Sequence, residues 1–334
     1  MTNRILVIRF SSLGDIILTE PIVRTIKTAY PDADISYLTK AGFLPLLDMF
    51  AHLDHRYGWV DDRDSTILLD TLRQRQFDLV VDLHAGIRSA RIRGALGVKA
   101  VRAKKEWFKR IASVKLNAVA GKPSHALERY LAALKELGID SKPERPFLQV
   151  PDGAHAWWHS RCTGSGVVGS YYVIAAGATH ATKRTPESLW VAIDRSIRNR
   201  FGIAPILIGS LAEHDYLTRL SERFDEPPIS IVTEDNIGRA AATIESADFV
   251  VSNDSGLAHL ASAVGTPVVA LFGPTHPILG FAPLGDHSDC YTIDEYCSPC
   301  SLHGDRRCHR SERFCFTKMQ VDTIIAKLKT LINR

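Results

Sequence analysis

Short apolar runs alternate with amphipathic runs along the whole chain, and this alternation restricts the fold more than any other feature. In the first half, residues 5–10, 35–38 and 79–83 are expected strands. Residues 15–29 are an expected helix, because their apolar side chains recur three and four positions apart. Strands that alternate with helices are typical of a parallel sheet with helices on both faces.

The second half repeats this pattern. Its expected strands are residues 171–176, 205–208, 249–252 and 268–272, and its expected helices are residues 186–201, 213–224, 237–246 and 256–264. A chain of 334 residues is long enough for two domains of this kind. We therefore expect an α/β protein with domains at residues 1–155 and 165–334. The linker is expected within residues 141–168, where prolines and a Gly/Ser run gather.

The composition excludes several classes of protein. Hydrophobic residues make up 45% and charged residues 23% of the chain, which excludes a mainly disordered protein. No apolar run approaches the ~18 residues that a membrane helix requires. The first ten residues do not resemble a signal peptide, because their apolar run is short and contains Arg9. These features predict a soluble, cytoplasmic protein.

The charge is distributed unevenly. Residues 1–150 contain 24 Lys and Arg against 17 Asp and Glu, whereas the rest of the chain contains 17 against 20. Most of the excess lies in residues 84–122, which have eleven basic residues and one acidic residue, Glu106. This asymmetry indicates an anionic partner for the first half. A solvated helix face is the alternative interpretation.

Two known motifs are matched in letters only. Residues 164–169 match G-x-G-x-x-G, but the expected strand follows the glycines instead of preceding them, so we reject a dinucleotide site. Residues 32–34 and 62–64 match D-x-D, a motif of metal-dependent sugar transfer, but both lie in expected turns. We interpret these matches as coincidence.

Three polar loops follow expected strands, at the sheet edge where open α/β sheets bind ligands. Asp15 comes after the first strand and its turn, where a carboxylate could also serve only as a helix cap. Loop 177–184 is polar and doubly basic, and a plain surface loop is its alternative. Loop 253–259 begins a helix whose free N–H groups can bind phosphate. Because the Asp254 carboxylate would repel a phosphate, we expect it to bind hydroxyl or ammonium groups instead.

These segments resemble one family. Residues 9–16, residues 179–186, and residues 253–259 with 272–275 are similar to the family 9 glycosyltransferases, the ADP-heptose:lipopolysaccharide heptosyltransferases and their relatives. The resemblance spans nearly the whole chain. It implies the GT-B fold, in which two Rossmann-like domains face each other across a cleft, with the acceptor on the first and the nucleotide-sugar donor on the second. It also implies an inverting transfer. We expect the transfer to require no cofactor, because both D-x-D matches lie in expected turns and Lys183 with the helix start at Ser255 can stabilise the departing diphosphate instead.

The resemblance implies a role for each site residue. Asp15 is the implied general base, and Lys183 is the implied catalytic cation that stabilises the departing diphosphate. The other implied donor-binding residues are Thr179, Glu213 for the ribose, Asp254, Ser255, Gly256 and His259. The implied acceptor-binding residues are Ser11, Ser12, Gly14 and Arg88. Relatives commonly have Trp before the proline that follows the donor lysine, whereas this chain has Thr185 before Pro186. This difference affects the expected packing around the loop and not the role of the lysine.

Basic and aromatic side chains are combined in residues 104–110, which read Lys-Lys-Glu-Trp-Phe-Lys-Arg. Such combinations are typical of segments at a membrane interface, and an anionic glycolipid acceptor in the inner leaflet would require one. Nucleic acid attracts the same charges, but the sequence contains no nucleic-acid-binding motif. We therefore expect a cytoplasmic protein peripheral to the inner membrane, with no nucleic-acid partner.

Four of the six cysteines fall within nineteen residues: Cys297, Cys300, Cys308 and Cys315. Four thiolates can form a tetrahedral Zn or Fe site, and a reducing cytoplasm disfavours disulfides. We expect a structural metal in a Cys-rich loop at residues 290–316, with His303 and His309 as substitute ligands and ordinary thiols as the alternative. Because this loop follows the last expected strand, we expect it to lie apart from the donor loops.

The sequence therefore predicts an inverting glycosyltransferase that moves a heptose or related sugar from an ADP-sugar to a lipopolysaccharide core or similar glycan. Two alternatives stay open: a nucleotide-sugar epimerase or hydrolase of the same fold, and a metal-containing nucleic-acid-binding protein. The second alternative leaves the loops around Lys183 and Asp254 unexplained.

Overall fold

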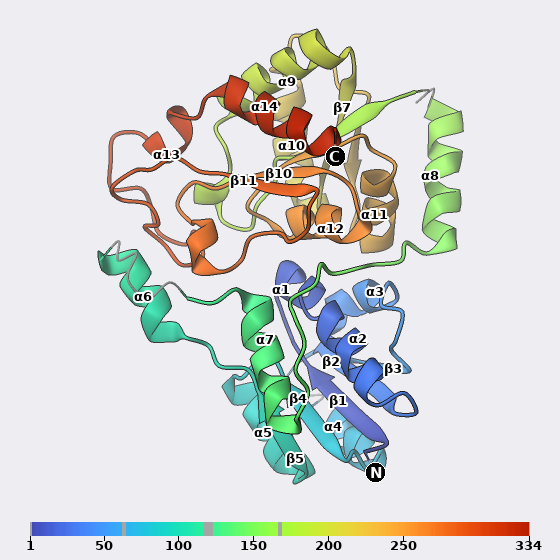
Figure 1. Cartoon of the computed structure of the whole chain (residues 1–334). Coiled ribbons are helices and arrows are strands. Elements are labelled where there is room, and N and C mark those ends of the chain that lie inside the picture. Colours follow the sequence, from blue (N-terminus) through green and yellow to red (C-terminus); the bar gives the residue numbers. More distant parts are fainter. Residues whose placement is uncertain (1, 62–64, 117–122, 166–168, 334) are drawn as a thin grey trace. The chain divides into compact units, whose positions relative to one another are not determined.

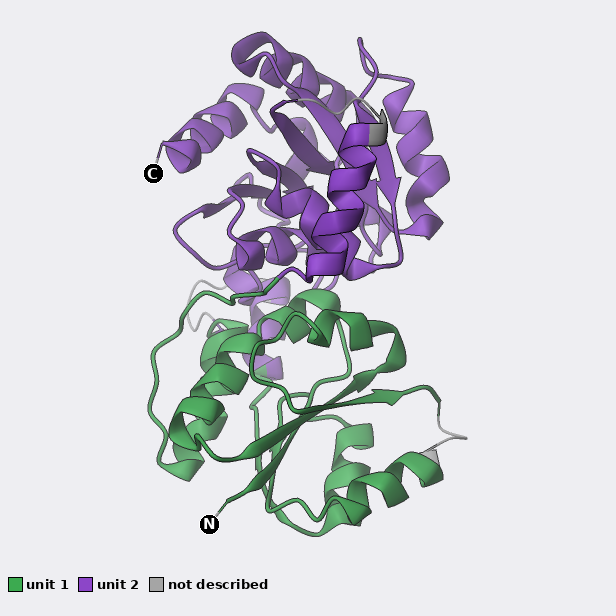
Figure 2. Ribbon diagram, turned by 90° about the vertical axis from the view of Figure 1, so that its right-hand side faces the viewer, with its two compact units in different colours: residues 1–106, 124–149 green, residues 107–123, 150–334 purple. Residues whose placement is uncertain are grey.

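The computed structural model describes residues 2–61, 65–116, 123–165 and 169–333. It divides the chain into two compact units, coloured separately in Figure 2: residues 1–106 with 124–149, and residues 107–123 with 150–334. The division differs from the expected one at residues 107–123. Helix α6 (Trp107–Leu116) belongs to the second unit because it packs on the turn η5 (Pro277–Leu279), and the Arg110 guanidinium lies 4.8 Å from the ring centre of Phe281.

Unit 1 contains a five-stranded parallel sheet in the order β3-β2-β1-β4-β5 (Figure 1). Its strands are β1 (Arg4–Ile8), β2 (Asp34–Lys40), β3 (His55–Trp59), β4 (Leu79–Asp82) and β5 (Lys99–Arg102). Its helices are α1 (Leu13–Ile17), α2 (Glu20–Ala29), α3 (Leu44–Leu47), α4 (Ser65–Gln74), α5 (Ile87–Leu96) and α7 (Ala126–Leu134), with 3₁₀ turns η1 (Ala41–Phe43) and η2 (Lys135–Leu137). The continuous apolar runs of β1 and β4 are almost wholly buried, as a sheet covered on both faces requires.

The single helix expected over residues 15–29 is wrong, because the structure breaks it into α1 and α2. Pro21 is the second residue of α2, where its missing N–H is not needed. In a continuous helix the same proline would lose one hydrogen bond and clash with the carbonyl of Ile17. The break ends α1 after one turn, so the segment that carries Asp15 is a short helical turn directly after β1.

Unit 2 contains a six-stranded parallel sheet in the order β11-β10-β9-β6-β7-β8. Its strands are β6 (Tyr171–Ala175), β7 (Ala204–Gly209), β8 (Ser230–Thr233), β9 (Val250–Asn253), β10 (Val268–Leu271) and β11 (Ser288–Tyr291). Besides α6, its helices are α8 (Asp152–Ser165), α9 (Glu187–Phe201), α10 (His214–Ser221), α11 (Ile237–Glu245), α12 (Gly256–Val264), α13 (Phe314–Thr317) and α14 (Val321–Ile332). The 3₁₀ turns are η3 (Ala181–Lys183), η4 (Leu211–Glu213) and η5.

The expected linker is wrong over helix α8, which occupies most of its second half. This helix packs against α11, and the buried ring of Trp158 lies 5.7 Å from that of Tyr171 at the start of β6. The G-x-G-x-x-G match begins at the end of α8, and its residues 166–168 lie outside the described residues, as do residues 62–64 of the second D-x-D match.

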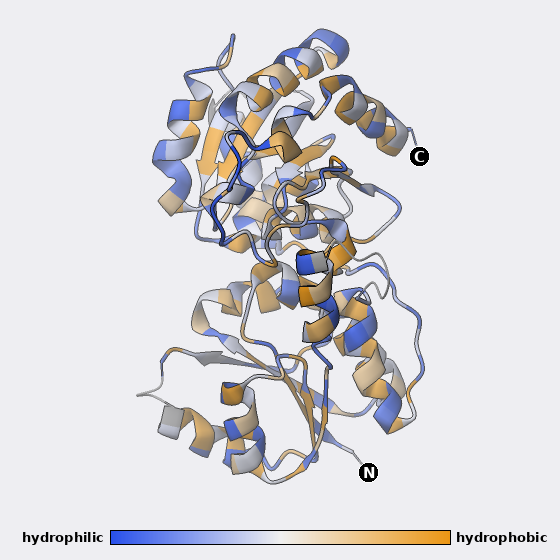
Figure 3. Ribbon diagram, turned by 90° about the vertical axis from the view of Figure 1, so that its left-hand side faces the viewer, coloured by the Kyte–Doolittle hydropathy of each residue, from blue (hydrophilic) through white to orange (hydrophobic). Residues whose placement is uncertain are grey.

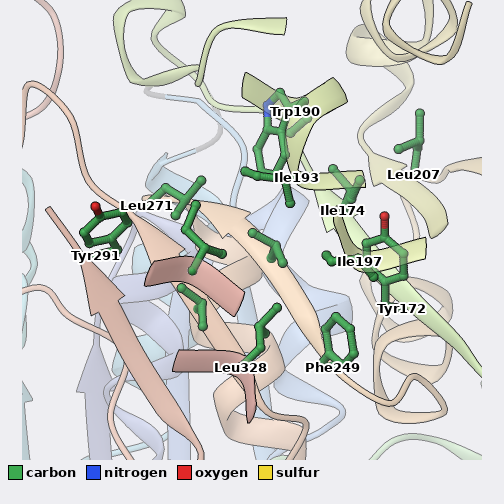
Figure 4. Close-up of a cluster of buried hydrophobic side chains, with 14 of the residues drawn as sticks. Tyr172, Ile174, Trp190, Ile193, Ile197, Leu207, Phe249, Leu271, Tyr291 and Leu328 are labelled. Atoms are coloured by element: carbon green, nitrogen blue, oxygen red, sulfur yellow. The ribbon is translucent and has the colours of Figure 1, made fainter. Parts of the chain in front are cut away.

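The core of unit 2 is formed by the sheet with helices α9 and α14 (Figure 4). Tyr172 and Leu207 on the strands, Trp190 on α9 and Leu328 on α14 are buried members of this cluster. Figure 3 shows strands of the unit 2 sheet as hydrophobic and most helices as mixed, since only one side of each helix meets a sheet. Among the described residues, no helix combines the length and apolarity needed to cross a bilayer.

Each sheet reverses its strand order at one point, between β1 and β4 in unit 1 and between β6 and β9 in unit 2. Open α/β sheets bind ligands outside the carboxyl ends of the strands at such a point. Asp15 follows β1 and Arg88 follows β4, whereas Lys183 follows β6 and Asp254 follows β9. The fold thus places the main candidate residues of each unit at the reversal point of its own sheet.

Candidate active site

Asp15 is the third residue of the short helix α1, at the exit of β1, and its side chain takes part in the capping box of this helix. Ser12 is the N-cap residue, and its backbone N–H and hydroxyl donate to Asp15 Oδ2 at 3.0 and 2.8 Å. Ser11 and Ser12 lie between β1 and α1, and Gly14 is the second residue of α1, directly before this carboxylate. The capping role that the sequence left open is therefore present in the structure.

The second carboxylate oxygen of Asp15 has partners that a cap does not need. The Arg9 guanidinium lies 2.8 Å from Oδ1, and the Tyr130 hydroxyl on α7 donates to the same oxygen at 3.3 Å. Arg9 is itself fixed, because it also donates to the carbonyl oxygens of Ser11 and Leu83 at 2.7 and 2.9 Å. Asp15 is thus held by two nearby residues, Ser12 and Arg9, and by Tyr130, which is 115 positions away in the sequence.

The protonation states of this group follow from its contacts. Burial acts to raise the pKa of the Asp15 carboxyl, but the charge of Arg9 and the hydrogen bonds from Ser12 outweigh it, so the pKa lies below its ordinary value. Burial raises the pKa of the Tyr130 phenol, so its hydroxyl stays protonated and donates. Asp15 is therefore an anion at neutral pH, held next to a fixed cation.

The loop after β4 forms the other side of this site. Asp82, which is fully buried, accepts hydrogen bonds from the backbone N–H groups of His84 and Ala85 and from Arg93 Nε. Burial, with the charges of Arg9 and Lys105, lowers the pKa of His84 to about 4, so its imidazole is neutral.

Arg88 lies in the first turn of α5, on an aromatic surface. Its guanidinium carbon lies 5.5 Å from the ring centre of Phe10 and 5.2 Å from that of Trp59. The His84 ring packs edge-on against Phe10 at 5.1 Å. Stacking on aromatic rings fixes the plane of a guanidinium, and a guanidinium is suited to bind carboxylate or phosphate groups. Arg88 therefore has the geometry of an anion contact beside the β1 loop.

In unit 2, the side chains of Lys183 and Asp254 meet from the two sides of the reversal point. Lys183 Nζ lies 2.6 Å from Asp254 Oδ2, and both side chains are mostly buried. The Thr275 hydroxyl donates to the same oxygen at 2.6 Å. Asp254 thus binds an ammonium and a hydroxyl group, the two kinds of partner that its place beside a phosphate seat favours.

Asn253 holds these loops together. It is fully buried at the end of β9, and its amide nitrogen donates to the carbonyl of Ala176 at 2.5 Å. Its amide oxygen accepts hydrogen bonds from the backbone N–H and the hydroxyl of Thr185 at 3.0 and 2.6 Å. The loop after β6 is therefore fixed at both ends to the last residue of β9.

The start of α12 has the properties of an anion seat. Ser255 is the N-cap and Gly256 the first helical residue, but no side-chain capping hydrogen bond is formed by Ser255. The first backbone N–H groups of the helix are thus left for another acceptor. His259 lies one turn further along α12 and is buried.

Glu213, the last residue of η4, lies against the loop after β6. Its Oε2 accepts hydrogen bonds from the backbone N–H and hydroxyl of Ser210 at 3.0 and 2.9 Å. Its carboxylate lies against the loop backbone, because a Cβ on Gly177 would be 2.2 Å from Oε1. Thr179 is exposed on the same loop.

The comparison with known families decides the class of this protein. The model of glycosyltransferase family 9 (heptosyltransferase) matches residues 66–309. The chain belongs to glycosyltransferase family 9. The expected resemblance is confirmed, and the protein is a glycosyltransferase.

The family 9 relatives agree in sequence and in fold. The chain is 27% identical over 291 residues to lipopolysaccharide heptosyltransferase 1 of Salmonella typhimurium, which covers 82% of this chain and 89% of that protein. The crystal structure of a family 9 glycosyltransferase from Veillonella parvula matches with a TM-score of 0.81 and 19% identity, over 99% of this chain and 97% of the other. ADP-heptose LPS heptosyltransferase II of E. coli matches with a TM-score of 0.78 and 20% identity, over 99% and 98%. The GT-B fold is thereby confirmed.

Two expectations about this glycosyltransferase need correction. The Cys-rich segment does not lie apart from the donor loops, because the hydroxyl of Thr182 donates to the carbonyl of Gly304 and Arg313 donates to that of Arg184 at 2.7 Å. Arg110 does not belong to an exposed basic surface, since it is 9% exposed and stacked on Phe281. In both cases the position of the residue is set by a contact with a residue far away in the sequence, which the neighbouring residues could not predict.

Proposed function

We propose that this enzyme transfers a heptose, or a related sugar, from an ADP-sugar to a lipopolysaccharide core or similar glycan, with inversion at the anomeric carbon. The observation that carries the proposal is the pair of Lys183 and Asp254 beside the uncapped start of α12. Curated relatives of this chain are named lipopolysaccharide heptosyltransferases, which supports the choice of sugar and acceptor.

The donor diphosphate is assigned to the start of α12 and to Lys183. The backbone N–H groups of α12 donate to phosphate oxygens, and the Lys183 ammonium neutralises the charge that grows on the diphosphate as it departs. Asp254 holds Lys183 in place, and Thr275 holds Asp254. The Glu213 carboxylate, which lies against Gly177, is assigned to the ribose hydroxyls, while Thr179 and His259 are assigned to the diphosphate.

The acceptor side is assigned to unit 1. The acceptor hydroxyl oxygen attacks the anomeric carbon, its proton passes to the Asp15 carboxylate, and the bond from that carbon to the diphosphate oxygen breaks, so that ADP leaves. A carboxylate with a lowered pKa is a weak base, which suffices because the hydroxyl becomes acidic as its oxygen bonds to carbon. Ser11, Ser12 and Gly14 shape this turn, and Arg88 is assigned to an acceptor anion.

The donor assignment is tested by calorimetry with ADP, UDP, GDP and AMP. We expect ADP to bind in preference to UDP and GDP, and AMP to bind more weakly than ADP because it lacks the second phosphate. Equal affinity for AMP and ADP would contradict the assignment of Lys183 and α12 to a diphosphate.

We propose further that the enzyme is peripheral to the inner membrane, at its cytoplasmic face. The side chains of Trp107 and Phe108 at the start of α6 are 55% and 83% exposed, and the lysines that flank them in the sequence, Lys104, Lys105 and Lys109, are also exposed. Exposed aromatic and basic groups together favour an anionic lipid surface.

Replacement of Lys104, Lys105 and Lys109 by Gln is expected to weaken binding to anionic vesicles. Each lysine near such a surface contributes about 1 kcal/mol, so the triple variant should bind on the order of 100-fold more weakly in co-sedimentation. The same change at three other exposed lysines, Lys135, Lys142 and Lys329, is the control and should leave binding nearly unchanged. Undiminished binding of the first variant would assign the basic segment to a water-soluble acceptor.

We also propose that Cys297, Cys300, Cys308 and Cys315 hold a structural Zn or Fe ion. The four residues line one cavity, with His309 and Arg313. Among the described residues, no group of three or more His, Cys, Asp or Glu side chains is already arranged to hold a metal ion. The Cys300 and Cys308 thiols instead donate to the carbonyl oxygens of Pro274 and Glu312, both at 3.7 Å, so metal binding would require these side chains to turn inward.

Protein purified without chelator is expected to contain about one Zn or Fe per chain by elemental analysis. Cys297→Ser should lose the metal and lower the unfolding temperature, because a four-thiolate site loses one ligand. It should also weaken ADP binding, since this segment contacts the Lys183 turn. Cys162→Ser, on α8, is the control that keeps the metal. Metal-free protein with four freely titratable thiols would reduce the cluster to ordinary cysteines.

A further inference from the structure

The Cys-rich segment contacts the turn that carries Lys183. Arg313, directly before α13, donates from one guanidinium nitrogen to the carbonyl oxygens of Arg184, Thr182 and Ala181 at 2.7, 3.3 and 3.5 Å. These carbonyls belong to the single 3₁₀ turn η3 and its end. A turn this short leaves most of its carbonyls without partners of its own, so an external donor decides where it lies.

The same segment also packs on the Lys183 side chain. Gly304 has φ +80°, and a Cβ at this position would lie 2.3 Å from Lys183 Cγ. The backbone of Gly304 accepts the hydroxyl of Thr182 from the neighbouring position in η3. Both the backbone and the aliphatic part of Lys183 are thus fixed by residues more than a hundred positions away in the sequence.

A second set of contacts joins the segment to the partner of Lys183. The backbone N–H groups of Cys300 and Ser301 donate to the carbonyl of Pro274 at 3.0 and 3.1 Å. Thr275 follows directly, and its hydroxyl donates to Asp254. The Cys-rich segment therefore bridges the two loops that bring Lys183 and Asp254 together.

We propose that Arg313 is a positioning residue for Lys183, and that the segment from Cys297 to Cys315 is a clamp that sets the donor site for the diphosphate. This inference rests on the proposed role of Lys183 in donor binding. Arg313 acts through the turn and not on the ligand, so its effect on the diphosphate requires the Lys183 ammonium to be present.

The test is a double-mutant cycle read by ADP calorimetry on the full chain. Arg313→Ala is expected to weaken ADP binding about tenfold, because it removes the charged donor that fixes the turn. Arg313→Lys should recover part of the loss, since one ammonium can still reach a carbonyl oxygen. Arg313→Ala added to Lys183→Ala should weaken binding no further than Lys183→Ala alone.

Arg200→Ala is the matched control. Arg200, at the end of α9, lies outside the clamp in the same unit and pairs with Asp322 at 2.8 Å. Its loss is expected to leave ADP affinity within about twofold. If Arg313→Ala does not fold, ADP affinity is measured on Arg313→Lys and on Thr182→Val instead. The second substitution removes the hydrogen bond to Gly304.

Two results would overturn the inference while the donor site stands. These are unchanged ADP affinity in the Arg313 variants, or losses that add to that of Lys183→Ala, either of which means that Arg313 does not act through Lys183. If Lys183→Ala itself leaves ADP binding unchanged, the proposed donor role fails, and the inference fails with it. The single lysine variant thus separates the two failures.

Discussion

Asp15→Asn is expected to lower kcat by about 10²- to 10⁴-fold while the affinity for ADP stays unchanged. The amide keeps the shape of the side chain and one acceptor oxygen for Arg9 and Tyr130, but it cannot take the proton of the attacking hydroxyl. Turnover is measured as ADP release in the presence of acceptor, and ADP affinity by calorimetry. A variant with near-normal turnover would show that Asp15 is only the cap of α1.

A matched variant separates this catalytic effect from a loss of stability. Asp78 accepts the backbone N–H groups of Asn3 and Arg4 at 2.8 and 2.9 Å, and these hydrogen bonds lower its pKa. It therefore resembles Asp15 chemically but lies beside the start of β1, at the edge of the sheet away from the reversal-point loops. Asp78→Asn should change the unfolding temperature and leave kcat close to that of the wild type.

The lowered pKa of Asp15 predicts the direction of a pH effect. A carboxylate whose pKa lies below its ordinary value, about 3.9, keeps its charge above that value and loses it only as the pH falls further. Both the base and its stabilising pairing with Arg9 should therefore persist down to about pH 4. A loss of kcat/KM centred well above pH 5 would have to come from a different group.

Lys183→Ala is expected to weaken ADP binding by about 10- to 100-fold and to lower kcat as well. A hydrogen bond to a charged group contributes roughly 1.5–3 kcal/mol, and the departing diphosphate gains charge in the transition state. The substitution also leaves the mostly buried Asp254 carboxylate without its cation, beside the place assigned to the phosphates. The added repulsion acts in the same direction as the lost contact.

Lys327→Ala provides the comparison for Lys183→Ala. Lys327 Nζ lies 2.8 Å from Asp289 Oδ2, so it forms the same kind of partly buried pair in the same unit. Asp289 is the second residue of β11, away from the carboxyl ends of the strands. This variant should bind ADP as the wild type does. Equal ADP affinity in both lysine variants would remove Lys183 from the donor site.

The fold was predictable because local sequence patterns, the apolar strand runs and the amphipathic helices, determine it. The apolar runs of β1, β4, β6 and β9 are buried on both faces, which only a covered parallel sheet allows. The loops after these strands could be placed at ligand-binding edges from the order of strands and helices alone. The break at Pro21 was readable too, since a proline seven residues into an expected helix is a strong stop signal.

The remaining features depend on contacts between distant residues. Arg9 lies within the segment that carries the family resemblance, but its role appears only when Tyr130 and Leu83 are brought beside it. Asn253 likewise gains its role from Thr185. The Cys-rich segment contacts η3 through Arg313, which is 129 positions from Arg184 in the sequence. No local sequence pattern predicts a contact between residues so far apart.

The most direct test of the account is a transfer assay with ADP-heptose and a lipopolysaccharide core acceptor that lacks heptose. Mass spectrometry of the acceptor, the amount of ADP released and the anomeric configuration of the product are measured together. We expect one heptose on each acceptor for each ADP released, with inverted configuration, and almost no ADP release when the acceptor is omitted. Consumption of ADP-heptose at the same rate with and without acceptor would contradict the account, because it would show hydrolysis or rearrangement of the donor instead of transfer.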